Sequence, residues 1–167
     1  MIVIKEKTTE ALVADDDFDI KKVRFNLDTM FTNKPCEALW TSSWNSHKEC
    51  ISWIKWCLRE EFKMKNTLYK ITSKRKVKLY EIDNPKDYTD NQLPKKGDYI
   101  DYKKLVQLGF DGLHVTDTGA ILGHLSDFEY MIRLNAFDCE STVWFNTDWI
   151  DMIEDICELN MLKDKGN

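Results

Sequence analysis

Alternating polar and apolar residues and short apolar runs dominate this chain, and both patterns predict strands. Alternation with a period of two is typical of a strand with one buried face, whereas a short apolar run fits a strand buried on both faces. Six segments have one of these patterns: residues 22–27, 38–44, 68–72, 77–82, 112–116 and 141–145. Turns separate the strands as often as helices do, so the sequence predicts an α+β fold with a mostly antiparallel mixed sheet and flanking helices.

Helical spacing of apolar residues appears in four other segments. Ser46 and Glu49 have the spacing of a capping box, in which the hydroxyl accepts from an exposed amide while the glutamate reaches back. The helix that follows is expected to end near residue 62 and to bury one stripe of side chains: Trp53, Ile54, Cys57 and Leu58. Further helices are expected over residues 99–108, over 127–134, and from 147 towards the C-terminus.

The length of 167 residues favours a single domain. Residues 1–19 combine a short Ile-Val-Ile run with the acidic cluster 15–17, and they are expected to be an N-terminal extension of a domain over residues 20–167. Hydrophobic residues make up 43% of the chain and charged residues 32%, which is typical of a globular protein. Aromatic residues reach 12%, with 6 tryptophans, which predicts a large rigid core or an aromatic-lined pocket.

Neither a membrane span nor a secretory signal is expected from the sequence. No apolar run approaches the roughly 20 residues that cross a bilayer. The first residues lack the basic lead and the sustained apolar stretch of a signal peptide. The five cysteines include no Cys-x-x-Cys pair, which favours reduced thiols in a cytoplasmic protein.

The net charge of -5 argues against duplex nucleic acid as a partner, because such binding needs a basic surface. Residues 74–78 offer only a short basic run. The histidines at 47, 114 and 124 lack the spacing of metal ligands, so no metal site is expected. His114 lies between two apolar residues of a predicted strand, and a hydrogen-bonded structural role is favoured over catalysis.

Asp138 and Glu140 are the acidic residues that stand out from the strand pattern. They lie two positions apart at the start of the strand predicted over 141–145, and in an extended chain such positions share one face. Apolar strand residues normally face a core, so an acidic pair here predicts a cleft. The alternative interpretation is that both acids end a loop and are solvated.

The order of several short motifs resembles the ADP-ribosyltransferase fold. Arg24 lies on the first predicted strand, Thr-Ser-Ser at 41–43 lies on the second, Leu-Gly-Phe-Asp-Gly-Leu spans 108–113, and Glu140 leads the last strand. Together these motifs span about residues 22–146. The sequence resembles more closely a group of small bacteriophage-encoded proteins of unsettled function. That closer resemblance rests on Lys34-Pro35 and on residues 39–42, 110–114 and 140–145.

This resemblance implies chemistry on NAD as the substrate. Breaking the nicotinamide–ribose bond creates an oxocarbenium-like centre, and the resemblance assigns Glu140 to its stabilisation. Arg24 would bind the pyrophosphate with its two-pronged guanidinium, and Ser42 or Ser43 would hold Glu140 or the ribose. The implied catalytic residues are Glu140, Ser42 and Arg24. The implied NAD contacts are Arg24, Trp40, Thr41, Ser42, Ser43, Trp44, Tyr69 and Asp138.

The acceptor of ADP-ribose is left open by the sequence. The resemblance implies a host protein or another macromolecule, reached in the host cytoplasm if the chain is phage-encoded. The second-strand motif reads Thr-Ser-Ser rather than Ser-Thr-Ser. Asp138 stands where members that modify arginine carry Glu or Gln, so the acceptor chemistry does not follow from the motif.

Two other functions fit the sequence. One is a nucleotide-binding protein that keeps the cleft without catalysis, and the other is an interaction protein whose acidic C-terminal helix blocks a host factor. The acidic residues of that helix are Asp148, Asp151, Glu154, Asp155 and Glu158. A surface ion pair explains Arg24 as well as phosphate binding does. Both the transferase and the nucleotide-binding function require Arg24, Ser42 and Glu140 to converge in one pocket.

Overall fold

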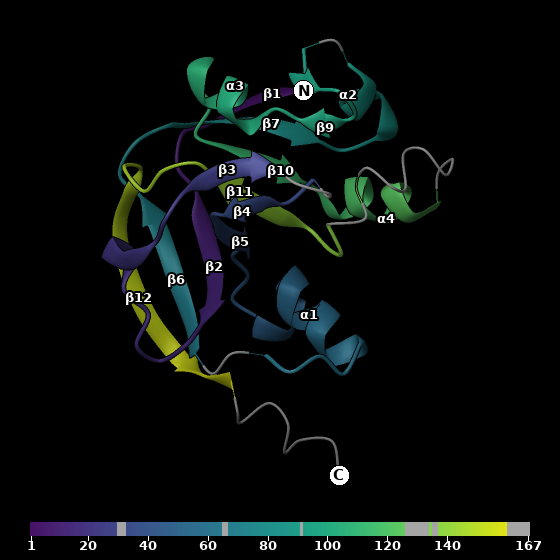
Figure 1. The fold of residues 1–167 in the computed structure, drawn as a ribbon. Coiled ribbons are helices and arrows are strands. Elements are labelled where there is room, and N and C mark those ends of the chain that lie inside the picture. Colours follow the sequence, from purple (N-terminus) through teal and green to yellow (C-terminus); the bar gives the residue numbers. More distant parts are fainter. Residues whose placement is uncertain (30–32, 65–66, 91, 126–133, 135–136, 160–167) are drawn as a thin grey trace.

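A mixed sheet of eight strands forms the centre of the fold in the computed structural model, which describes residues 1–29, 33–64, 67–90, 92–125, 134 and 137–159 (Figure 1). Across the sheet the strands are β1 (Ile2–Lys5), β7 (Val77–Ile82), β10 (Gly112–Val115), β11 (Ser141–Trp144), β5 (Leu39–Ser43), β2 (Thr9–Ala14), β6 (Thr67–Ser73) and β12 (Ile150–Glu158). Neighbours β7 and β10 are parallel, and the other neighbouring pairs of this sheet are antiparallel. The predicted α+β domain with a mostly antiparallel mixed sheet is confirmed.

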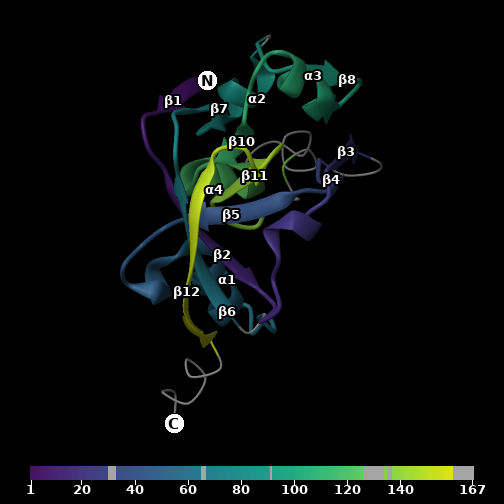
Figure 2. The ribbon, with the colours of Figure 1, turned by 90° about the vertical axis from the view of Figure 1, so that its left-hand side faces the viewer.

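The sheet has two halves that run in different directions. Strands β6, β2 and β12 run steeply in Figure 1, whereas β7 and β10 run across the view. Strand β5 lies between the β10–β11 pair and the β2–β6 pair (Figure 2). One apolar cluster draws on both halves: Leu12, Leu39, Tyr69, Ile71, Val77, Leu79, Trp144 and Trp149. Its burial from water holds the two halves together.

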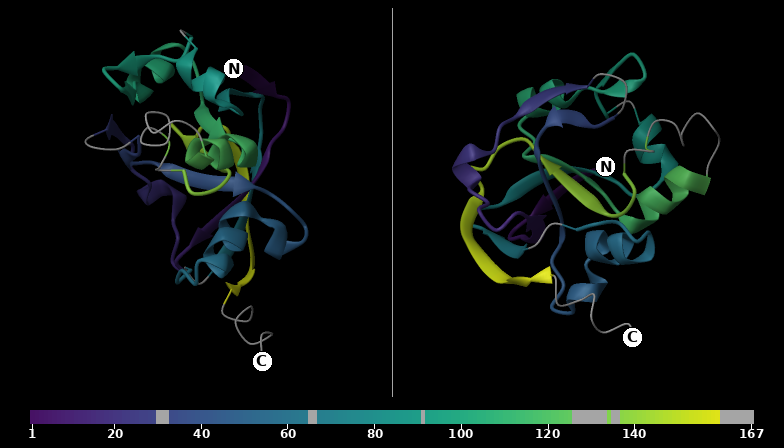
Figure 3. Two further views of the ribbon diagram at one scale, coloured as in Figure 1. Left: turned by 90° about the vertical axis from the view of Figure 1, so that its right-hand side faces the viewer. Right: turned by 60° about the horizontal axis from the view of Figure 1, so that its bottom comes forward.

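Helices cover the other face of each half. Helices α2 (Pro85–Thr89), α3 (Tyr102–Gln107) and α4 (Asp117–Leu125) pack with β7, β10 and β11, and α1 (Ser52–Arg59) packs with β2 and β6 (Figure 3). The remaining elements are β3 (Asn26–Thr29), β4 (Pro35–Glu37), β8 (Lys95–Lys96), β9 (Tyr99–Ile100) and the 3-10 turns η1 (Ile20–Lys22) and η2 (Lys48–Cys50). In the ranges given above, no helix has both the length and the apolar character needed to cross a membrane.

Helix α1 confirms a helix in the predicted place, but its start and its buried face differ from the prediction. Ile54 and Cys57 are buried, whereas Trp53 is half-buried and Leu58 is 42% exposed. The predicted capping box does not form, because η2 intervenes and the N-cap residue is Ile51, which makes no side-chain cap. The helix therefore presents part of its aromatic surface outward.

The expected N-terminal extension is instead part of the sheet. Strand β1 pairs with β7, and β2 lies between β5 and β6 with Ala11 and Leu12 buried. The acidic run 15–17 is a turn that follows β2, so it marks the end of a strand rather than a peripheral segment. The strand predicted over 22–27 is also wrong in its start. The chain first forms η1, capped by the Asp19 side chain, and β3 begins only at Asn26.

The predicted C-terminal helix is a strand over Ile150–Glu158. Ile150 and Ile153 have helical spacing, yet both are partly buried against the shared apolar cluster. The register with β6 shifts between Ile150 and Met152 and again between Asp155 and Cys157. Each such irregularity adds a residue, so positions three apart return to one face of the strand. The acidic side chains therefore lie along an edge strand, where charge deters pairing with other chains.

Three other predictions concern two helices and the cysteines. The helix expected over 99–108 is confirmed as α3 over Tyr102–Gln107, whereas its predicted start is wrong because Tyr99–Ile100 form β9. Gly109 follows α3 with a φ of 75°, the left-handed conformation that glycine adopts at a helix end. The helix expected over 127–134 falls mainly outside the described residues. Cys50, Cys57, Cys139 and Cys157 are free thiols, and the side chain of Cys36 is also outside the description.

Candidate functional site

Two serines at the end of β5 hold Glu140, which lies in the bend leading into β11. The backbone N–H of Ser43 lies 3.1 Å from each carboxylate oxygen of Glu140, and the Ser43 hydroxyl donates to Oε1 at 3.0 Å. The Ser42 hydroxyl donates to the backbone carbonyl of Glu140 at 3.0 Å. The Glu140 side chain is only 9% exposed. The antiparallel pairing of β5 with β11 brings these residues together and fixes both the backbone and the carboxylate.

His114 on β10 lies between two carboxylates. Its Nε2 is 2.9 Å from Glu140 Oε1 and its Nδ1 is 3.0 Å from Glu81 Oε2. Burial disfavours the charged imidazolium, but the hydrogen bonds to Glu140 and Glu81 outweigh burial and raise the pKa of His114 to about 9. The hydrogen bond from His114 also lowers the pKa of Glu81. At neutral pH this group is a buried cation between two carboxylates, in line with the hydrogen-bonded role expected for His114.

Glu10 on β2 is a further buried carboxylate, and it forms a polar layer with Thr41, Ser43, His114 and Glu140. Its side chain accepts hydrogen bonds from the hydroxyls of Thr8 and Thr41, the second at 2.8 Å. The Trp144 indole N–H donates to the same Thr41 hydroxyl at 2.8 Å. Burial raises the pKa of Glu10, and the negative charge of Glu140 raises it further. The polar layer thus joins β2, β5 and β11 from inside the sheet.

Asp138 points to different partners from Glu140. Residues 138–140 form a bend rather than an extended strand, so the prediction that both acidic side chains share a face is wrong. Asp138 Oδ2 lies 3.9 Å from Lys34 Nζ, and both side chains are partly exposed. Asp138 lines a cavity, whereas Glu140 is not among the described residues that line it. The acid that faces open space is therefore Asp138.

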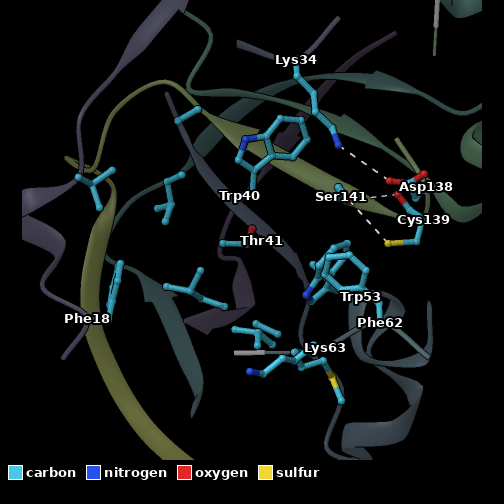
Figure 4. Close-up of a pocket in the computed structure, with 18 residues that line it drawn as sticks. Phe18, Lys34, Trp40, Thr41, Trp53, Phe62, Lys63, Asp138, Cys139 and Ser141 are labelled. Atoms are coloured by element: carbon cyan, nitrogen blue, oxygen red, sulfur yellow. Dashed lines mark hydrogen bonds and ion pairs between the residues drawn. The ribbon is translucent and has the colours of Figure 1, made fainter. Parts of the chain in front are cut away.

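This cavity has a volume of about 480 Å³ and lies over β2 and β5 (Figure 4). Its aromatic lining residues are Phe18, Trp40, Trp53 and Phe62, and its charged ones are Lys34, Lys63 and Asp138. Ser141 and Cys139 lie beside Asp138, and the Ser141 hydroxyl donates to the Cys139 carbonyl at 3.1 Å. The cavity is thus an aromatic slot with charged groups near it.

The walls of the cavity come from separate parts of the chain. Trp40 lies on β5, and its ring centroid is 5.4 Å from that of Phe137. Trp53 lies on α1 and packs against Phe62 at 6.0 Å between centroids. The Lys34 ammonium lies 5.8 Å from the Trp40 centroid. In Figure 4, Lys34 and Asp138 lie above Trp53 and Phe62, and Lys63 lies below them. The two lysines therefore mark different ends of the aromatic slot.

Six of the residues predicted for the site lie in or directly behind this cavity. Those that line it are Trp40, Thr41, Ser42 and Asp138. Ser43 and Glu140 contact each other on the other side of the same two chain segments. The Thr41 hydroxyl is engaged by Glu10 and Trp144, so it serves the polar layer. The roles that these residues would have towards NAD stay predictions.

The structure does not bring Arg24, Trp44 or Tyr69 into the cavity lining that it describes. Arg24 is exposed in the segment between η1 and β3, although its neighbour Val23 does line the cavity. Trp44 packs against the α1 cluster. The buried Tyr69 donates its hydroxyl to the backbone carbonyls of residues 15 and 16 at 3.2 Å. The expected meeting of Arg24 with Ser42 and Glu140 in one pocket is thus not found, because alternation wrongly placed Arg24 on a strand. A nucleotide site built on these three residues is therefore excluded, and any nucleotide site must use the other residues that line the cavity.

Several residues of the cavity were not recognised as such from the sequence. Phe18, Phe62 and Lys63 belong to no motif, and the helical spacing around Trp53 predicts a core residue. Lys34 carries only the Lys-Pro resemblance. The one signal that pointed to them was the aromatic content of 12%, which predicted a large rigid core or an aromatic-lined pocket without placing it.

Comparison with known proteins gives no match: no family model, no curated protein and no solved structure matches this chain. Within the residues that can be described, no group of three or more His, Cys, Asp or Glu side chains could hold a metal ion. The geometry of the cavity and of the polar layer behind it is therefore the basis for assigning a function.

Proposed function

We propose that this chain binds a nucleotide in the aromatic cavity. The observation that carries the proposal is an aromatic slot with Lys34 and Lys63 at different ends and a volume of about 480 Å³, within the usual range for small-molecule sites. Every base has a π-face that stacks on aromatic side chains, and a lysine ammonium attracts phosphate. A planar base with an attached phosphate fits both features.

In this proposal Glu140 is a structural residue. Its carboxylate already accepts from the Ser43 backbone, the Ser43 hydroxyl and His114. These partners hold it away from the cavity, behind the bend that carries Asp138. The function is then nucleotide binding without catalysis by Glu140.

Removing the Trp40 ring is expected to weaken nucleotide binding by about 1–3 kcal/mol, the usual value of one base stacked on an aromatic side chain. Calorimetry with purine and pyrimidine mononucleotides measures this effect on Trp40→Ala. Trp40→Phe should keep most of the affinity, because a phenyl ring still stacks. Since Trp40 also packs against the core, both variants are first compared with the unmodified protein by thermal unfolding.

The charge of Lys63 at the cavity can be removed and compared with removal of a lysine charge outside the cavity. Lys63→Gln should weaken binding of mononucleotides but not of the free nucleosides, since it removes only a phosphate contact. Lys55 on α1 is also exposed but does not line the cavity, so Lys55→Gln should leave binding unchanged. If no mononucleotide binds at millimolar concentration, the proposal fails.

ADP-ribosyl transfer is a second candidate function, favoured by the contact between Ser43 and Glu140. It requires a pyrophosphate contact other than Arg24, because Arg24 lies outside this site. A hydroxyl on the second motif strand donating to the glutamate at 3.0 Å is the arrangement that the resemblance implies. In this case the fold is of the ADP-ribosyltransferase type, NAD is the substrate and a host macromolecule is the acceptor. Labelled NAD with host lysate tests it. Glu140→Gln should keep NAD affinity within a few-fold and lower turnover by on the order of a hundredfold.

A further inference from the structure

One end of the aromatic cavity combines an acidic and a basic side chain, and the basic one lies over the Trp40 ring. Among the lining residues that the structure describes, Asp138 is the only acidic one. Lys34 Nζ lies 3.9 Å from Asp138 Oδ2 and 5.8 Å from the Trp40 ring centroid. A base stacked on Trp40 beside the Lys34 ammonium would therefore have its edge near one ammonium donor and the two carboxylate acceptors of Asp138.

The order of these groups matches guanine. The pairing edge of guanine presents the O6 acceptor, then the N1–H donor, then the N2 amino donor. Lys34 can donate to O6, while the two oxygens of Asp138 accept from N1–H and N2–H. Adenine presents an amino donor and then the N1 lone pair, so a lone pair would face the carboxylate. Uracil presents O4, N3–H and O2, so an acceptor would face the carboxylate where guanine has its amino donor, and its single ring offers less area to stack on Trp40.

An organic cation is the competing ligand for an aromatic site with a carboxylate. Here the Lys34 ammonium already lies close to both the Trp40 ring and Asp138. A second cation would be repelled by Lys34 and would leave Lys63 without a role. A neutral base that carries an anionic phosphate satisfies the carboxylate and both lysines.

We propose that the cavity selects guanine nucleotides and that Asp138 determines this specificity. The base stacks on Trp40, its pairing edge lies against Asp138 and Lys34, and its phosphate lies towards Lys63. This inference rests on the proposed nucleotide site and adds the identity of the base.

Calorimetry with GMP, IMP, AMP and UMP tests the selectivity. GMP should bind on the order of tenfold or more tightly than AMP and UMP, the discrimination that a two-bond contact to a base edge gives. IMP lacks only the N2 amino group, so its affinity should fall between those of GMP and AMP. Equal affinity for GMP and AMP would overturn the base assignment and leave the nucleotide site intact. If none of the four binds but choline does, both the site and the base assignment are wrong.

Asp138→Asn provides a test that a loss of folding cannot imitate. The new amide offers one acceptor and one donor, which matches the N1–H and the O2 of xanthine better than the two donors of guanine. The variant should bind GMP on the order of tenfold more weakly and XMP more tightly than the unmodified protein does. Asp28→Asn is the matched control, because Asp28 is a 60% exposed partner of Lys103 outside this cavity. Unchanged GMP and XMP affinities in Asp138→Asn would exclude Asp138 as the specificity residue.

Discussion

Replacing Trp144 with alanine is expected to lower the free energy of unfolding by about 3–5 kcal/mol, the usual cost of truncating a large buried aromatic. The Trp144 side chain is 0% exposed and stacks on Trp149 with 3.9 Å between ring centroids. Its indole N–H also donates to the Thr41 hydroxyl, so the variant leaves that polar layer short of a donor. Urea unfolding followed by far-UV circular dichroism measures the loss.

Trp53→Ala is the variant against which the loss of unfolding free energy in Trp144→Ala is compared. The sequence alone suggested that Trp53 is a core residue, but its ring is half-buried, lines the cavity and stacks on Trp56 at 5.0 Å. Truncating it removes less buried area and leaves a space that solvent already reaches, so the loss should be clearly smaller. A larger loss for Trp53→Ala than for Trp144→Ala would show that the deeper core is not where the structure places it.

The class of fold and most of the central strands follow from local patterns in the sequence. Residues 67–73, 77–82 and 112–115 are strands because β-branched and aromatic residues alternate or cluster there between turn residues. These preferences depend on a few neighbouring residues, so the same segments are strands in the folded chain. Helix α3 was predictable for a similar reason, since its glycine stop is local.

The errors arose where a distant partner decides the structure. The isoleucines of β12 have helical spacing, and only pairing with β6 through two irregularities makes them one face of a strand. The N-terminal strands were missed because β1 and β2 reach the sheet through partners more than 30 residues away, which no local pattern reveals. Tertiary context overrode the local period in both places.

The candidate site was predictable only in part, and for the same reason. The sequence grouped Ser42, Ser43 and Glu140, and the structure brings these three together through the β5–β11 pairing. It could not show that a bend turns Asp138 away from Glu140, because that depends on the start of β11 at Ser141. Nor could it group Lys63 with Trp40, which line the same cavity only after α1 has packed on the sheet.

Stability is expected to fall as the pH rises from about 6.5 through about 9, because His114 loses its proton. The folded pKa of His114 is about 9, against an ordinary value of 6.5, because the hydrogen bonds to Glu140 and Glu81 outweigh the opposing effect of burial. A raised pKa means that the folded state holds the proton more tightly, so this contribution is complete below pH 6.5 and lost above pH 9. The shift corresponds to roughly 3 kcal/mol. Urea midpoints measured between pH 6 and pH 10 record the fall.

At acidic pH the dependence of stability on pH has the opposite sign, because stability falls as the pH falls. His114 lowers the folded pKa of Glu81, so the stability that Glu81 contributes is present above its ordinary value of 4.5 and lost as the pH falls through the lowered value. His114→Gln should therefore flatten the profile on the alkaline side and remove the shift of Glu81 on the acidic side. His47→Gln is the matched control, because His47 is exposed and its side chain makes no cap contact at η2. If NMR shows His114 titrating near pH 6.5 in the folded protein, the pair of carboxylates does not hold its proton and the predicted alkaline loss will not occur.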